Sequence, residues 1–164
     1  FVTIFKSGSA WVVRKGNPNK VDVSDVCGLK VTVQTATIQE EEVNKLNEQC
    51  KADGKKAIDV LSNKLQTDVT TNVTTGKADV SYADSAVAGY ALAQTDGQLE
   101  TLGKATGMAK EAVAVKKGDT ATAQAVQKAL QKLIDDGTYM KILKHWGVES
   151  GALDKAEVNP TDLD

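Results

Sequence analysis

Short apolar segments alternate with longer segments of helical periodicity over most of this chain. Runs rich in β-branched residues, or alternating with a period of two, predict strands at residues 1–5, 9–14, 30–34, 57–61, 79–82, 98–102 and 111–116. Spacing of three and four between apolar positions predicts helices at residues 38–53, 65–77, 85–94, 119–136 and 138–146. Strands that alternate with helices are typical of an α/β sheet with parallel neighbours and right-handed connections.

Several helix ends are marked by their own residues. Thr37 to Glu40 has the form of a capping box, and the helix that follows should bury Val43 and Leu46. Asp119 should cap the long fourth helix. That helix has an apolar stripe formed by Ala123, Val126, Leu130, Leu133 and Ile134. No strand follows the last two helices, so we expect them to pack on something other than this sheet.

Composition excludes several classes of protein. With 41% hydrophobic and 26% charged residues, the chain can build a packed core. A net charge of -2 gives no basic excess for nucleic acid. One histidine and two cysteines leave little material for a transition-metal site, and we expect no cofactor. No apolar run approaches the roughly 18 residues that a membrane span needs.

The two ends of the sequence carry different signals. Residue 1 is a Phe inside a strand-like run, with no initiator Met or signal peptide before it. We therefore expect this chain to be part of a longer protein. Residues 149–164 contain five acids and one lysine without apolar periodicity, which indicates a solvated acidic tail.

The two cysteines lie at the same end of one predicted strand–helix unit. Cys27 precedes the strand at 30–34 and Cys50 lies near the end of the next helix, and the two elements span similar lengths in opposite directions. A disulfide here would add roughly 3 kcal/mol in the chain-entropy treatment and would indicate an oxidising compartment. Two buried thiols are the alternative.

Two strand ends are candidate binding positions, because ligands of open α/β sheets lie beyond the carboxyl ends of the strands. At the first, Thr37 begins a helix whose N–H groups and dipole attract a carboxylate or phosphate. At the second, Asp84 could hold a cationic group. In each case the alternative is that the residue only caps its own helix. Together the two ends describe a receptor for a zwitterion.

Three segments resemble one protein family in the same order along the chain. They are residues 27–40 (CGLKVTVQTATIQE), 76–85 (GKADVSYADS) and 136–147 (DGTYMKILKHWG). They resemble the signatures of the extracellular solute-binding proteins of family 3, the polar amino-acid-binding proteins of ABC transporters. The resemblance covers roughly residues 1–150.

The resemblance implies a type II periplasmic-binding-protein-like fold, with two α/β lobes that close like a hinge. Its mixed, mainly parallel sheet would belong to lobe two, and most of the N-terminal lobe would lie outside this chain. The implied divisions are 1–9 as the end of lobe one and a hinge strand, 10–105 as lobe two, 106–118 as the return strand, 119–148 as lobe-one helices and 149–164 as the tail.

The resemblance also implies roles for individual residues. Asp84 would pair with the ligand α-ammonium, and the helix start at Thr37, Ile38 and Gln39 would meet the carboxylate. Gln66 and Thr67 would touch the ligand side chain. The family commonly has Gly-Thr-Thr-Gln where this chain has Ala-Thr-Ile-Gln at 36–39, so a hydroxyl is lost at Ile38. The cysteine pair resembles a disulfide of Gram-positive members.

The implied function is extracytoplasmic capture of an amino acid and delivery to the permease of an ABC importer, without catalysis. A dehydratase-like enzyme and the ligand-sensing domain of a receptor are the alternatives on the same fold. A dehydratase would need a further acid or base beside Asp84, and a receptor would continue into a membrane helix. Without its lobe-one partner, the chain is expected to expose apolar helix faces and to self-associate.

Overall fold

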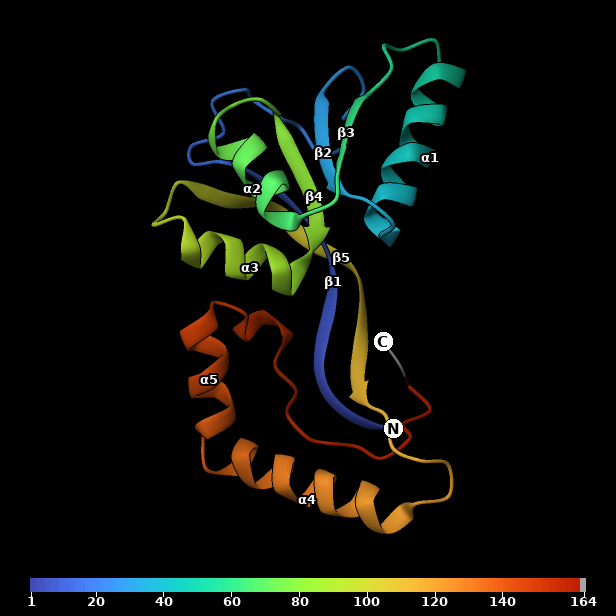
Figure 1. Ribbon diagram of the computed structural model, residues 1–164, viewed down its shortest axis with the longest axis vertical. Coiled ribbons are helices and arrows are strands. Elements are labelled where there is room, and N and C mark those ends of the chain that lie inside the picture. Colours follow the sequence, from blue (N-terminus) through green and yellow to red (C-terminus); the bar gives the residue numbers. More distant parts are fainter. Residues whose placement is uncertain (163–164) are drawn as a thin grey trace. The chain divides into compact units, whose positions relative to one another are not determined.

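The computed structural model describes residues 1–162 and has an α/β fold, as the sequence predicts (Figure 1). Its strands are β1 (Val2–Arg14), β2 (Lys30–Gln34), β3 (Asp59–Asn63), β4 (Val80–Asp84) and β5 (Leu99–Val113). Its helices are α1 (Ile38–Ala52), α2 (Gln66–Thr74), α3 (Ser85–Gln94), α4 (Thr120–Asp135) and α5 (Thr138–Trp146), followed by one 3₁₀ turn, η1 (Glu149–Gly151).

The strands form one mixed sheet in the order β3-β2-β4-β1-β5. β2 pairs in parallel with both β3 and β4, while β1 runs antiparallel to β4. The parallel strands are each followed by a helix, so their carboxyl ends and the helix starts meet at one edge. Ser9 on β1 lies opposite Asp84 at that edge.

The chain divides into two compact units. Unit 2 comprises residues 9–106, and unit 1 comprises residues 1–8 together with 107–164, of which 1–8 and 107–162 are described. β1 and β5 contribute residues to both units.

Unit 2 has a sheet covered on both faces. α1 covers one face, and α2 and α3 lie against the other (Figure 1). Alternate residues of β1 explain this arrangement, because a strand points successive side chains to opposite faces. Trp11 and Val13 join the core under α1, whereas Ala10 and Val12 join the core under α2 and α3.

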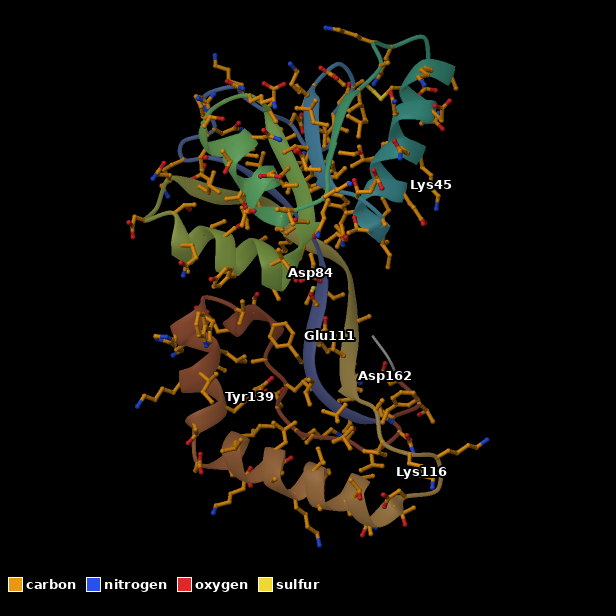
Figure 2. The ribbon with its side chains drawn as sticks, in the orientation of Figure 1. Lys45, Asp84, Glu111, Lys116, Tyr139 and Asp162 are labelled. Atoms are coloured by element: carbon orange, nitrogen blue, oxygen red, sulfur yellow. A yellow bond between two sulfur atoms is a disulfide. The ribbon has the colours of Figure 1, made fainter. Side chains whose placement is uncertain are left out.

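Unit 1 is organised around α4, α5 and the C-terminal segment. Tyr139 on α5 lies inside this unit (Figure 2); its hydroxyl donates to the carbonyl of Ile4 at 2.9 Å and accepts from the N–H of Leu153 at 3.1 Å. Val2 and Val158 form an antiparallel bridge. The prediction that residues 149–164 form a solvated tail is wrong for much of the described part, 149–162, because Leu153 and Ala156 are buried there. Residues 163 and 164 lie outside the described residues.

Two pairs of predicted strands are single strands in the structure. Residues 2–5 and 9–14 belong to β1, because the polar Ser7 between them is small enough to be buried within the strand. Residues 99–102 and 111–113 of the two predicted strands belong to β5. Gly103 and Gly107 in its middle have positive φ angles of 76° and 61°, and such glycines interrupt the alternation by which strands are predicted.

Two smaller predictions about α1 and β3 are also wrong. β3 begins at Asp59 rather than Ala57, because the N–H of Ile58 bonds the Asn47 side chain at 2.8 Å instead of joining the ladder. Leu46 is 39% exposed. The buried residues of α1 are Val43 and Cys50. Leu46 has the spacing of the same stripe but lies at its edge, about 60° around the helix from Val43, and so remains partly exposed.

Candidate functional site

A small cavity of about 40 Å³ lies in unit 2 at the carboxyl ends of β2 and β4. The starts of α1, α2 and α3 surround it. Its lining consists of Gln34, Thr37, Gln39, Gln66, Tyr82, Ala83, Asp84 and Val87. Larger hollows on α4 and α1 are each lined by side chains along one helix. The small cavity is therefore the candidate site, since it combines strand ends with helix starts.

The first wall of the cavity is the start of α1. Thr37 has an extended backbone, and its hydroxyl accepts from the N–H of Glu40 at 3.2 Å and donates to the carbonyl of Gln34 at 2.8 Å. The capping alternative for Thr37 is therefore realised in the structure. The N–H groups of Ile38 and Gln39 have no acceptor within the helix, because the first turn of any α-helix provides none. They form the positive end of the α1 dipole.

Glu40 fixes the turn that precedes α1. Its carboxylate accepts a hydrogen bond from the N–H of Ala36 at 2.8 Å. In the expected capping box it would accept from the N–H of Thr37 itself, so the bond is made one residue earlier. Hydrogen bonds from the Ser62 hydroxyl and the Ala36 N–H hold the pKa of Glu40 below its usual value. Ala36 itself has a φ of 61°, in the left-handed region that favours glycine.

The second wall of the cavity is Asp84, at the junction of β4 and α3 (Figure 2). One carboxylate oxygen, Oδ1, accepts from the N–H of Ala86 at 2.8 Å and of Val87 at 3.2 Å. The capping alternative is thus realised here as well. Since the same carboxylate lines the cavity, capping and an acceptor role toward a ligand are compatible at this residue.

A chain of polar side chains extends from the cavity into unit 2. The Gln39 side-chain NH₂ donates to the Ser9 hydroxyl at 2.9 Å, and Ser9 in turn hydrogen-bonds the Tyr82 hydroxyl. The Tyr82 oxygen lies 3.3 Å from the Thr106 hydroxyl. Its ring stacks on Trp11 with centroids 4.1 Å apart. Burial raises the pKa of Tyr82, so its phenol stays neutral well above pH 7.

The structure brings together four of the six residues predicted to touch a ligand. Thr37, Gln39, Gln66 and Asp84 line the cavity. Ile38 does not line it, and its side chain is 68% exposed, whereas Thr67 is exposed at the start of α2.

Four lining residues were given no ligand role from the sequence, namely Gln34, Tyr82, Ala83 and Val87. Gln34 is the last residue of a strand that was predicted with its correct bounds, so the strand-end rule could have found it. Tyr82 is the last residue of the predicted strand 79–82, so the same rule could have found it. Ala83 lies in the two residues by which β4 extends beyond that predicted end.

The predicted disulfide is present between Cys27 and Cys50, with their Cα atoms 5.6 Å apart. It joins the loop before β2 to the last turn of α1, at the opposite end of that helix from Thr37. Cys50 is buried in the core under α1.

Two structural features are absent from residues 1–162. Within that range no helix has the length and apolar character that crossing a membrane requires. The same residues contain no group of three or more His, Cys, Asp or Glu side chains placed to hold a metal ion.

Comparison with known proteins adds sequence relatives. The chain is 33% identical over 164 residues to the arginine-binding protein ArgT of Corynebacterium glutamicum, matching 99% of this chain and 54% of that protein. It thus spans about half the length of this curated relative.

The chain is also similar to solved structures of amino-acid-binding proteins. An ancestral arginine-binding protein bound to arginine is 29% identical, with a TM-score of 0.57 over 88% of this chain and 62% of that one. An ancestral cationic amino acid solute-binding protein has a TM-score of 0.74 at 22% identity, over 88% of this chain and 60% of that one. The second likeness concerns the fold alone.

The family described as bacterial extracellular solute-binding proteins, family 3, matches residues 1–149, which is most of the sequence. That match and the 33% identity to a binding protein agree with the three motifs at 27–40, 76–85 and 136–147. The chain therefore belongs to the bacterial extracellular solute-binding proteins of family 3.

Proposed function

We propose that this protein captures an amino acid at the edge of unit 2 and delivers it to the permease of an ABC importer. Family membership supports a binding function, and the cavity at the ends of β2 and β4 supports this location. In this proposal the ligand leaves chemically unchanged, and the protein works outside the cytoplasm, where the Cys27–Cys50 disulfide is stable.

One observation carries the proposal, namely that opposite charges face one small cavity. The start of α1 supplies N–H groups and the positive end of a helix dipole, which favour a carboxylate. Asp84 supplies a carboxylate, which favours an ammonium group. An α-amino acid carries both groups on one carbon, so a single ligand satisfies both walls.

The size of the cavity indicates how much of a ligand unit 2 holds. About 40 Å³ accommodates a group the size of one water molecule or one ammonium, and not a whole amino acid. We propose that residues 10–105 act as lobe two, that 119–148 belong to lobe one, and that protein outside these 164 residues completes the site. The length of the arginine-binding relative, of which this chain matches 54%, supports this division.

Arginine is the first ligand to test. The relative at 33% identity is named an arginine-binding protein, and a solved relative at 29% identity is bound to arginine. Gln66, which lines the cavity, and Thr67 beside it would contact the ligand side chain.

The test is an amide NMR titration of the chain with arginine, lysine, citrulline and glutamine. We expect saturable shifts at residues 37–39 and at Asp84, strongest for arginine. Asp84→Asn removes the charge but keeps a good cap, so we expect about 10- to 100-fold weaker binding with little loss of stability. Asp119→Asn is the matched control, because Asp119 caps α4 in the same manner.

Two results would contradict the proposal. One is the absence of saturable shifts with all twenty amino acids at ten millimolar, and the other is unchanged affinity in Asp84→Asn. If mass spectrometry found arginine converted to another compound during the titration, the proposal of binding without catalysis would be wrong.

A further inference from the structure

We infer that Ser9, Tyr82 and Glu42 are positioning residues that hold the Gln39 side-chain amide in one orientation, with its carbonyl oxygen toward the cavity. This inference rests on the proposed function and deepens it. It concerns how the site distinguishes an ammonium group from other groups of similar size.

The direction of each hydrogen bond follows from the donors available. Tyr82 has one proton, and the Glu42 carboxylate, which interacts with the Tyr82 hydroxyl, can only accept. The Tyr82 proton therefore goes to Glu42, and the Ser9 proton goes to the Tyr82 oxygen. Ser9 is then left with lone pairs only, and it accepts from the Gln39 NH₂ at 2.9 Å.

The members of this chain are held firmly. Ser9 is 8% exposed and Tyr82 is 6% exposed, so water has little access to replace their partners. The stacking of Tyr82 on Trp11 fixes its ring. Because the Ser9 proton is directed at Tyr82, turning the Gln39 amide around would place two acceptors, the amide oxygen and the Ser9 oxygen, against each other, which is unfavourable.

The position of Ser9 links this chain to Asp84. Ser9 and Asp84 are paired across the antiparallel β1–β4 ladder, and Gln39 and Asp84 line the same cavity. Since the Gln39 nitrogen is directed at Ser9, its carbonyl oxygen is the atom that remains for a ligand. The cavity then presents two acceptor groups side by side, an arrangement that suits an ammonium with its three N–H donors and disfavours a hydroxyl with one.

The first readout requires no ligand. The Gln39 side-chain NH₂ signal in the NMR spectrum should exchange slowly with solvent in the wild-type chain. We expect Ser9→Ala and Tyr82→Phe to shift this signal and to speed its exchange several-fold. Tyr90→Phe, an exposed tyrosine on α3, is the matched control and should leave the signal unchanged.

The second readout compares arginine with argininic acid, which carries a hydroxyl in place of the α-ammonium. Wild type should prefer arginine. Gln39→Leu should weaken arginine binding about 10-fold or more, because a hydrogen bond to a charged group is lost. Ser9→Ala and Tyr82→Phe should reduce the preference for arginine over argininic acid several-fold, whereas a general loss of structure would weaken both ligands equally.

An unchanged Gln39 NH₂ signal in both Ser9→Ala and Tyr82→Phe would overturn the inference, as would equal weakening of the two ligands. Failure of wild type to bind arginine or any other amino acid would overturn the proposed function and, with it, the ligand-facing role of Gln39. The ligand-free signal distinguishes that failure from an error in the hydrogen-bond chain.

Discussion

Replacing Ala36 with glycine is expected to stabilise unit 2, although Ala-to-Gly substitutions usually destabilise proteins. Ala36 has a φ of 61° in the turn between β2 and α1. Its N–H is held by the Glu40 carboxylate at 2.8 Å, which fixes the backbone in this conformation. The side chain is exposed, so glycine loses little packing.

The size of the effect follows from two opposing contributions. A left-handed backbone costs an L-residue roughly 1–2 kcal/mol, which glycine avoids. Glycine makes the unfolded chain more flexible, which offsets roughly 0.4–1 kcal/mol of that gain. The net stabilisation should be about 0.5–1 kcal/mol, or roughly 2–6 °C in the melting temperature of a unit of about 100 residues.

Urea unfolding followed by circular dichroism measures the difference, with Ala93→Gly as the matched control. Ala93 is exposed within α3, where φ is helical, so glycine there should destabilise by about 0.5–1 kcal/mol. Opposite signs for the two substitutions would support the argument. Destabilisation by Ala36→Gly equal to that of Ala93→Gly would refute it.

Three further predictions concern other parts of the chain. Reduction of the Cys27–Cys50 disulfide, which spans 23 positions, should lower the unfolding free energy of unit 2 by about 3.4 kcal/mol in the chain-entropy treatment. Denaturant titration with and without reductant measures this loss, and a loss below about 1 kcal/mol would contradict the prediction. Gly151→Ala should release the C-terminal segment from unit 1, because the new Cβ would overlap the Lys6 carbonyl oxygen and the Phe5 ring; faster amide exchange at residues 152–159 is the expected result, and unchanged protection would disprove the clash. Glu40→Gln should destabilise unit 2 at neutral pH, because the lowered pKa of Glu40 means that its ionised form is stabilised by folding. The difference in unfolding free energy between variant and wild type should narrow as pH falls below about 4.3, the ordinary pKa of glutamate. A difference that stayed constant down to pH 2 would exclude the carboxylate as its source.

Much of unit 2 could be predicted from the sequence because local signals there agree with one another. The strand 30–34, the cap at Thr37 and the helix 85–94 lie where the pattern places them. Each has a local cause, either two-residue alternation or a capping side chain. The carboxyl-end rule then brought Thr37 and Asp84 to one cavity, which no local signal alone provides.

Other features could not be predicted because long-range contacts determine them. The Asn47 side chain accepts a hydrogen bond from the N–H of Ile58, so Ile58 does not join the strand ladder and β3 begins at Asp59. The segment after α5 contains too few apolar residues to show a period, yet the Thr3 N–H bonds the Glu157 carbonyl at 3.0 Å and draws this segment into unit 1. Lining residues such as Val87 depend on how α3 packs, which no local pattern specifies.

The isoleucine at position 38 illustrates how the geometry of a site can make a departure from a family pattern tolerable. A threonine hydroxyl there would add one donor, but the side chain at 38 is 68% exposed and does not line the cavity. The Thr37 hydroxyl already donates to the Gln34 carbonyl and accepts from Glu40, so its proton is not available to a carboxylate. An anionic group at the start of α1 must therefore rely on the backbone N–H groups of the first turn. Those groups are present whatever the side chain, and so the change to Ile38 preserves the anion-binding chemistry of the helix start.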